Sequence, residues 1–181
     1  MEKIKIHDKT FRKLIPYDEI TVNIDKVAEK LNRDLKDCPE PPIILSVLNG
    51  SFMFATELVK RLEVQCEIMF IRLASYEGTS STGKVREIIG LNKDVAGRTI
   101  VIVEDIVDTG KTIEILNEML LKAGAEDIKV CTLFFKPESY SKNVFIDYPA
   151  MKIPNDFIVG FGLDYNQLGR QYKDIYVIDE E

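Results

Sequence analysis

The sequence predicts an α/β fold: a single domain with a central, mostly parallel sheet flanked by helices. Short continuous apolar runs, typical of buried parallel strands, alternate with amphipathic helical patterns from residue 43 to residue 135. The length of 181 residues suits one domain, and no internal repeat, low-complexity tract or linker divides it. Apolar residues make up 45% and charged residues 30%, ordinary values for a globular protein.

The expected elements are read from apolar spacing and from proline and glycine breaks. Ile20, Ile24 and Val27 begin the first helical pattern, and three prolines after residue 38 end it. The elements expected in order are a helix at about 18–36, a strand at 43–48, a helix at 54–62, strands at 67–73, 88–91 and 98–103, a helix at 112–122 and a strand at 129–135. Short apolar segments at 157–160 and 175–178 follow.

These elements suggest a core with a smaller lobe over it. The core is expected to span about 40–140, where the strand and helix patterns alternate. The remaining segments, about 1–15 and 145–181, are expected to form the lobe over one end of the sheet, here called the hood.

Charge and composition exclude several classes of function. A net charge of −6 and a pI near 5.0 argue against non-specific nucleic-acid binding. Cys38, Cys66 and Cys131 lack metal-ligand spacing and are expected to be reduced, as in a cytoplasmic protein. With His7 as its only histidine, the chain has no multi-histidine metal site. No apolar run is long enough to cross a membrane, and residues 1–12 lack a signal core.

Two adjacent acids, Glu104 and Asp105, stand where the strand at 98–103 is expected to end. Ligands of open α/β sheets bind beyond the carboxyl ends of the strands. Adjacent carboxylates are costly to bury unpaired, and vicinal sugar hydroxyls or a magnesium ion would relieve that cost. The alternative is a solvated strand end.

A turn of small residues follows and opens a helix. Asp108-Thr109-Gly110-Lys111-Thr112 supplies free backbone N–H groups at a helix N-terminus, where a phosphate fits. Gly110 permits a close approach and an unusual backbone angle. Alone, the turn would favour an ordinary N-cap. Joined to the strand and the acid pair, it indicates a phosphorylated sugar as the ligand. The spacing matches neither of the common glycine-rich nucleotide motifs.

The segment Val103–Thr112 resembles the phosphoribosyl pyrophosphate (PRPP) motif of type I phosphoribosyltransferases, and more narrowly that of hypoxanthine-guanine phosphoribosyltransferases. The resemblance covers about 40–181. It implies Mg²⁺-dependent transfer of 5-phosphoribosyl from PRPP to hypoxanthine or guanine, giving IMP or GMP and pyrophosphate. It assigns PRPP binding to Glu104, Asp105, Asp108, Thr109, Gly110, Lys111 and Thr112. Asp108 would also be the catalytic base, taking the proton of purine N7.

The other motifs of that family follow in the expected order. Leu48-Asn49-Gly50-Ser51-Phe52 resembles the pyrophosphate loop, with a cis peptide before Asn49. Asn49 and Gly50 would bind pyrophosphate, although relatives often carry Lys or Arg at the position of Asn49. Ser75 and Tyr76 resemble the start of a lid loop; without the resemblance, an idle surface loop is equally expected.

The purine and the metal are assigned by the same resemblance. The residues it assigns to the purine are Ile106, Lys136, Phe157, Ile158 and Asp164. Lys136 would donate to the 6-oxo group, and Phe157 would stack on the base. Arg170 would contact pyrophosphate. Mg²⁺ would be held by Glu104, Asp105 and Asp164.

Other functions stay open at this stage. A phosphoribosyltransferase for xanthine, adenine or a pyrimidine would share most of these motifs. A PRPP-binding regulator of nucleotide synthesis would need a basic surface, which the acidic balance argues against. A non-catalytic α/β binding module would leave the motifs as coincidence. The expected partners are small-molecule substrates, with no nucleic acid and no membrane, in a homo-oligomer that is a dimer or a tetramer.

Overall fold

A six-stranded sheet forms the body of the molecule, in a computed structural model that describes residues 2–74, 86–91 and 93–179. The strand order is β5-β4-β3-β6-β7-β8, and every neighbouring pair is parallel except β4 and β5. The bounds are β3 Ile43–Val47, β4 Glu67–Ala74, β5 Arg86–Ile89, β6 Thr99–Val107, β7 Asp127–Phe135 and β8 Tyr148–Lys152. The predicted mostly parallel sheet is therefore confirmed.

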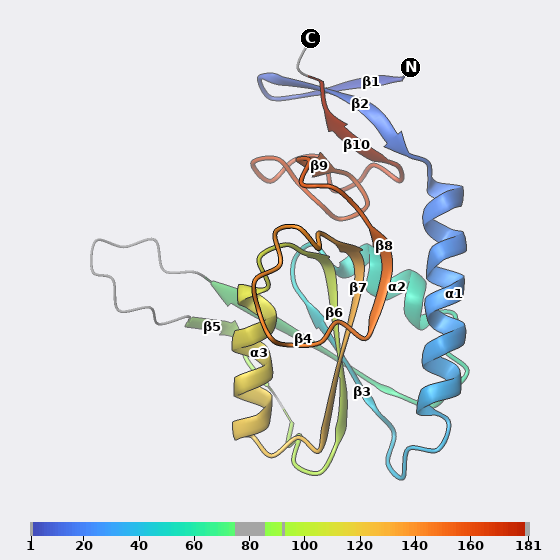
Figure 1. The fold of residues 1–181 in the computed structure, drawn as a ribbon, viewed down its shortest axis with the longest axis vertical. Helices are drawn as coiled ribbons and strands as arrows, with labels where there is room; N and C mark the ends of the chain where they lie inside the picture. Colours follow the sequence, from blue (N-terminus) through green and yellow to red (C-terminus); the bar gives the residue numbers. More distant parts are fainter. Residues whose placement is uncertain (1, 75–85, 92, 180–181) are drawn as a thin grey trace.

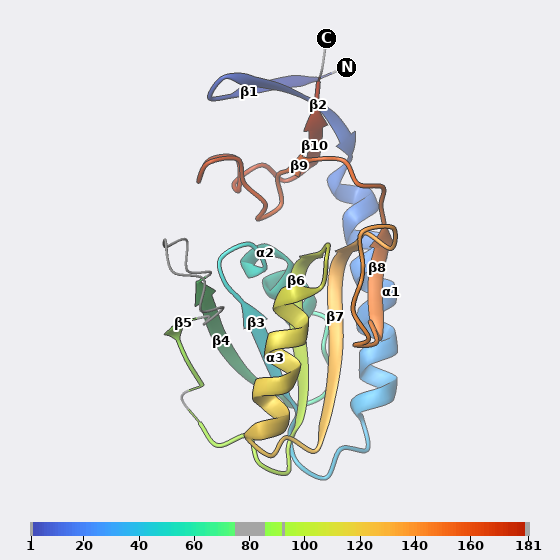
Figure 2. The same ribbon diagram turned by 60° about the vertical axis from the view of Figure 1, so that its left-hand side comes forward.

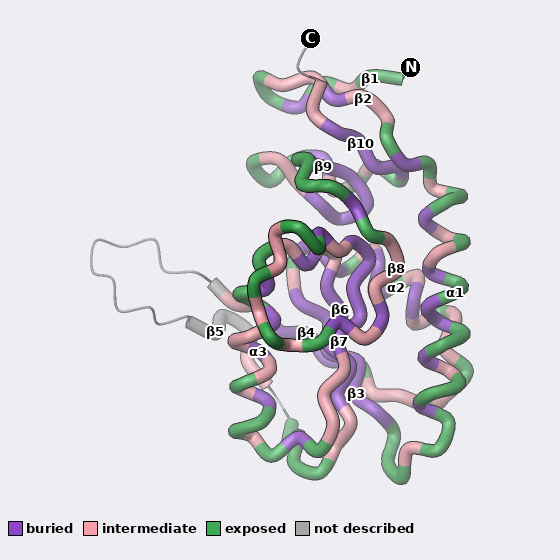
Figure 3. The backbone as a smooth tube through the Cα atoms, viewed as in Figure 1, coloured by how far each residue is buried: buried purple, intermediate pink, exposed green. Residues whose placement is uncertain are grey.

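Three helices cover the two faces of this sheet (Figure 1). They are α1 (Tyr17–Leu35), α2 (Phe52–Val59) and α3 (Lys111–Lys122). Side chains of β6 alternate between two cores: Val101 and Val103 pack with α1 and α2, whereas Ile100 and Ile102 pack with α3. Period-two alternation on a strand covered on both faces explains the continuous apolar run. Figure 3 shows the buried residues following these strands.

The hood is a separate antiparallel sheet above the carboxyl ends of the core strands (Figure 2). Its order is β1-β2-β10-β9, with β1 Lys3–Ile6, β2 Lys9–Ile15, β9 Ile158–Val159 and β10 Ile175–Ile178. Ile6, Phe11, Val159 and Tyr176 form its own small core. Segments far apart in sequence therefore build one roof over the edge of the sheet where ligands of α/β folds bind.

The structure differs from the expectation in three places. Strands β1 and β2 were not expected, because lysines interrupt their apolar residues. Residues 148–152, expected in the hood, form β8 and pair with β7 in the core sheet. Strand β6 runs on from Val103 to Val107, because its pairing with β7 continues through Glu104 and Ile106.

No helix in the described ranges is long and apolar enough to cross a membrane. Ser75 and Tyr76, which were expected to begin a lid, lie outside the described residues.

Candidate active site

Glu104 and Asp105 lie inside β6, near its carboxyl end, and both line a pocket there. Glu104 pairs with Thr132 of β7 and is buried, with 6% of its surface exposed. Burial raises the pKa of Glu104 well above its ordinary value, and the neighbouring Asp105 carboxylate raises it further. Burial also raises the pKa of Asp105 to about 6, opposed by the N–H of Ile106, which donates to Oδ1 at 3.0 Å. The positive charge near Glu104 and Asp105 is therefore too small to offset two carboxylates.

The pyrophosphate loop packs directly against this acid pair. The Leu48–Asn49 peptide is cis, as the resemblance implied. Gly50 is buried, and a Cβ at that position would lie 1.5 Å from Asp105 Oδ2. Behind the loop, the hydroxyl of Ser51 donates to the Val47 carbonyl at 2.5 Å and lies 2.7 Å from Ser46 Oγ. These buried hydrogen bonds fix the loop between β3 and α2, while the Asn49 side chain is exposed.

A pocket of about 270 Å³ lies between the loop, the acids and α3. Its lining is Val47, Leu48, Gly50, Leu73, Glu104, Asp105, Lys111, Thr112 and Ile115. Leu73 and Ile115 are apolar walls that the sequence analysis missed, because core residues in a strand and a helix carry no local sign of lining a site. The carboxylates and the helix N-terminus thus share one cavity.

A second, smaller pocket of about 100 Å³ forms at the start of α3. It is lined by Glu104 and by residues 106–113. Gly110 adopts φ 82°, and a Cβ there would meet the Tyr140 ring at 2.3 Å, so glycine is required. The first N–H groups of α3 have no acceptor within the helix, and Lys111, Thr112 and Ile113, which begin it, line this pocket. The segment Asp108–Thr112, here called the phosphate cradle, suits an anion of phosphate size.

Asp108 and Lys136 form an ion pair at the ends of adjacent strands. Lys136 Nζ lies 3.1 Å from Asp108 Oδ2, and the backbone N–H of Lys136 donates to the Val107 carbonyl at 3.0 Å. The Lys136 side chain is 9% exposed, whereas that of Asp108 is 46% exposed. Asp108, the predicted base, thus lies beside Lys136, the predicted contact of the 6-oxo group. The Lys136 ammonium is a hydrogen-bond donor, and the Asp108 carboxylate is an acceptor.

Arg170 is held within the hood segment that touches the loop Leu48–Phe52. Its Nη2 lies 2.6 Å from Asp164 Oδ1, and its Nη1 donates to the Gly162 carbonyl at 2.7 Å. A Cβ on Gly162 would lie 2.0 Å from the Gly50 carbonyl oxygen, so the two loops touch through backbone. Gly162 was missed by the sequence analysis, although its place in Gly160-Phe161-Gly162 could have indicated a close approach.

Phe157 and Ile158 come from the hood. Phe157 is 46% exposed, and its ring lies edge-on to Tyr165 at 5.8 Å between centroids. Ile158 is buried and pairs with Val177 of β10. Ile106, half-buried on β6, lines the smaller pocket. An exposed aromatic ring carried by a buried strand is a suitable platform for a flat ligand.

The three expected metal ligands are not gathered into one cluster. Among the described residues, no group of three or more His, Cys, Asp or Glu side chains is placed to hold a metal ion. Asp164 instead pairs with Arg170 and accepts the N–H of Gln167 at 2.7 Å. Glu104 and Asp105 remain as two adjacent oxygen donors. This set fits Mg²⁺, which commonly uses one or two carboxylates together with substrate phosphates.

The chain is similar to proteins of one family along most of its length. Residues 16–166 match the phosphoribosyl transferase domain. A hypoxanthine-guanine phosphoribosyltransferase of Streptococcus pyogenes is 40% identical over 165 residues, 91% of each chain. A hypoxanthine phosphoribosyltransferase structure from Trypanosoma cruzi, complexed with the product IMP, aligns with a TM-score of 0.87 at 32% identity, covering 98% of this chain and 94% of that one.

A third relative agrees. The hypoxanthine phosphoribosyltransferase structure from Staphylococcus aureus aligns with a TM-score of 0.85 at 31% identity, covering 93% of this chain and 91% of that one. The fold agrees with the resemblance read from the motifs. The chain belongs to the phosphoribosyltransferase family.

Proposed function

We propose that this chain is a purine salvage enzyme that transfers 5-phosphoribosyl from PRPP to hypoxanthine or guanine. The observation that carries the proposal is the Lys136–Asp108 pair, 3.1 Å apart beside the phosphate cradle. In a 6-oxopurine, the O6 acceptor and the N7–H donor lie on the same edge. The ammonium suits O6, and the carboxylate suits N7–H. Adenine, whose 6-amino group donates, would oppose Lys136.

The reaction forms a bond between purine nitrogen and ribose C1, and breaks the bond from C1 to pyrophosphate. Asp108 accepts the N7 proton as the purine attacks, a contribution of roughly 10²–10⁴ in rate for a general base. The cradle at Asp108–Thr112 binds the 5′-phosphate and fixes the ribose. Gly50 offers a backbone N–H to the departing pyrophosphate. Phe157 stacks on the purine, and the Ile158 backbone reads its edge.

The buried acids orient the ribose hydroxyls and provide donors for Mg²⁺. When bound, the ion would offset the negative charge of the pyrophosphate. Asp164 is proposed as a further ligand, in which case it must exchange its contact with Arg170 for the metal. Arg170, so released, is placed to bind pyrophosphate. Asn49 adds no positive charge to the loop, so pyrophosphate would be bound by Arg170 and by backbone N–H groups.

The enzyme is proposed to work as one catalytic unit of core and hood in a cytoplasmic homo-oligomer, a dimer or a tetramer. Ile68 and Phe70 are each 47% exposed on one face of β4, and Phe52 at the start of α2 is 42% exposed. Exposed apolar side chains of this kind often mark an interface. The three cysteines are free, as expected in a reducing compartment. Light scattering after size-exclusion chromatography measures the oligomer directly.

The test is product formation from PRPP and Mg²⁺, with hypoxanthine, guanine, xanthine and adenine offered separately. We expect turnover of hypoxanthine or guanine, loss of turnover with chelator, and little turnover of adenine. Preferred use of xanthine would change the substrate but keep the reaction. Absence of turnover with every base would contradict the proposal and favour a PRPP-binding regulator.

A further inference from the structure

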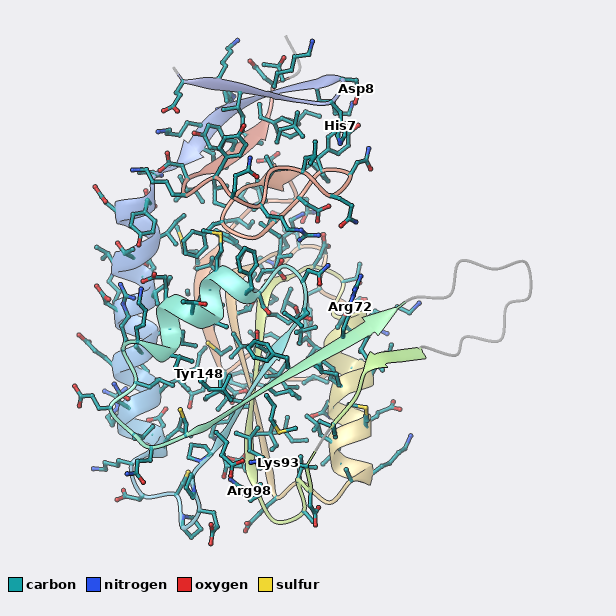
Figure 4. All side chains as sticks on the ribbon, turned by 180° about the vertical axis from the view of Figure 1, so that it is seen from behind. His7, Asp8, Arg72, Lys93, Arg98 and Tyr148 are labelled. Atoms are coloured by element: carbon teal, nitrogen blue, oxygen red, sulfur yellow. The ribbon has the colours of Figure 1, made fainter. Side chains whose placement is uncertain are left out.

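Side chains of the β1–β2 turn contact Tyr165, next to Phe157, the ring proposed to stack on the purine. The contacts of His7 and Asp8 with residues 165 and 166 are here called the brace. His7 and Asp8 form that turn, with His7 at φ 52°. Figure 4 shows both at the tip of the hairpin, beside the loops of the hood. The Tyr165 hydroxyl donates to Asp8 Oδ1 at 2.9 Å, and His7 Nε2 lies 3.1 Å from the Asn166 carbonyl oxygen. The His7 ring meets Tyr165 edge-on at 5.8 Å.

Tyr165 begins a tight turn that also fixes Asp164. The Tyr165 N–H donates to the Leu168 carbonyl at 2.9 Å, and the Leu168 N–H returns to the Tyr165 carbonyl at 3.1 Å. Asn166 and Gln167 between them have positive φ, and the Gln167 N–H donates to Asp164 Oδ2 at 2.7 Å. These hydrogen bonds are donated by backbone N–H groups, so they hold Asp164 without the Tyr165 hydroxyl.

The Tyr165 ring supports Phe157. Their centroids lie 5.8 Å apart at an interplanar angle of 83°, an edge-to-face contact. The buried ring of Phe11 completes the group, at 6.0 Å from Tyr165 and 6.3 Å from Phe157. Phe11 and Tyr165 are thus aromatic neighbours of Phe157, which still has 46% of its surface exposed.

We propose that Tyr165, anchored by Asp8, is a positioning residue that presets the Phe157 ring for stacking on the purine. The inference rests on the proposed function. Tyr165 acts on the base through Phe157 and takes no part in the chemistry at ribose C1. Its loss frees Phe157 to adopt other rotamers before the base binds, and ordering the ring again costs binding free energy. The effect falls on the KM of the purine and spares turnover.

Four variants test the brace. Tyr165→Phe removes only the hydroxyl, and Asp8→Ala removes only its acceptor, whereas Asp8→Asn keeps an acceptor oxygen at the same place. Glu2→Ala is the matched control, because Glu2 is another exposed carboxylate that accepts from a hood tyrosine, Tyr176, at 3.2 Å. In the part of the chain that the structure describes, the Glu2 carboxylate contacts Tyr176 and Lys13, and it makes no hydrogen bond or ion pair with Tyr165 or Phe157. KM for hypoxanthine, KM for PRPP and kcat are measured for each.

We expect Tyr165→Phe and Asp8→Ala to raise the purine KM roughly two- to tenfold, the factor that one net hydrogen bond supplies. The double variant should match the single ones, because both remove the same bond. Asp8→Asn and Glu2→Ala should stay near wild type, and kcat and the PRPP KM should change less than twofold. An unchanged purine KM in an active protein, or equal losses in all three parameters, would overturn the inference.

Hydrogen exchange separates this result from a failure of the proposed function. In the ligand-free protein, amides of residues 156–168 should exchange faster in Asp8→Ala than in wild type, and not in Asp8→Asn. Equal exchange in all three would overturn the brace whether or not the protein turns over any purine. Faster exchange in Asp8→Ala, together with a wild type that turns over no purine, would keep the brace but remove the proposed function, and with it the role of Tyr165 in purine binding.

Discussion

The backbone of Gly50 lies against the carboxylate of Asp105, so closely that a Cβ on Gly50 would be 1.5 Å from Oδ2 and 2.5 Å from Cγ. The pyrophosphate loop and the acid pair therefore cannot move independently. Any side chain at position 50 must displace either the loop or the carboxylate, both of which belong to the proposed PRPP site.

Gly50→Ala is expected to lower kcat/KM for PRPP sharply and to destabilise the fold by about 1–3 kcal/mol, the usual cost of overpacking. Gly97→Ala is the control, since Gly97 has φ 67° but no atom within 4 Å of a Cβ. An alanine at position 97 is therefore strained by its backbone angle but clashes with no neighbouring atom. Steady-state kinetics and thermal unfolding compare the two, and equal PRPP kinetics in both variants would contradict the steric argument.

Asp108→Asn is expected to lower kcat about 10²–10⁴-fold, with a smaller effect on substrate KM. The amide keeps the size of the side chain but cannot accept the N7 proton. Because Asp108 is 46% exposed, the change should leave thermal stability near wild type. Unchanged turnover at saturating substrates would remove Asp108 from the role of base.

Lys136→Ala is expected to weaken use of 6-oxopurines by roughly tenfold or more, as loss of a charged hydrogen bond predicts. Lys129→Ala is a suitable control, because Lys129 lies on β7, the strand that Lys136 directly follows, and pairs with Asp127 at 3.0 Å at the other end of that strand. Initial rates with hypoxanthine, guanine and adenine give the comparison. A purine profile identical to wild type would contradict the O6 contact.

The ligand-free protein is expected to lose stability as pH rises from about 4 through 6. The pKa of Asp105 is about 6 in the folded protein, above its ordinary 3.8, so the folded state holds a proton that the unfolded state has released. Removing that proton leaves a buried charge, which Glu104 and Asp164 oppose and Arg170 only partly offsets. Protonated Asp105 therefore contributes stability at low pH, and that contribution is lost as the pH rises through about 6.

Asp105→Asn checks this directly. In the presence of chelator, the variant should have a higher Tm than wild type at pH 8 and nearly the same Tm at pH 4. Mg²⁺ with PRPP should restore wild type and not the variant. A wild-type Tm that rises relative to the variant between pH 4 and pH 7 would show that the buried charge is not the cause.

The central part of the predicted site depends on local patterns. The apolar run of β6, the acid pair and the turn at Gly110 are adjacent in sequence, so their juxtaposition in space needs no long-range contact. The pairing of Lys136 with Asp108 follows from the adjacency of β6 and β7, which the alternation of strands and helices implied.

Contacts between distant segments were not predictable in the same way. Gly162 meets Gly50, and Asp8 meets Tyr165 across 157 residues, through packing that no single segment encodes. Strand β8 carries Pro149 and Lys152 at the edge of the sheet, where a full apolar pattern is not required, so it was assigned to the hood.

The strand order of the hood has a consequence for synthesis of the protein. Strand β10, the furthest along the sequence, lies between β2 and β9 and joins them. The residues that line the pocket at the start of α3 all precede Ile175–Ile178 in the sequence by more than sixty positions. The base platform must wait for Ile175–Ile178. The hood is therefore completed last during synthesis, after every strand of the core sheet has been made.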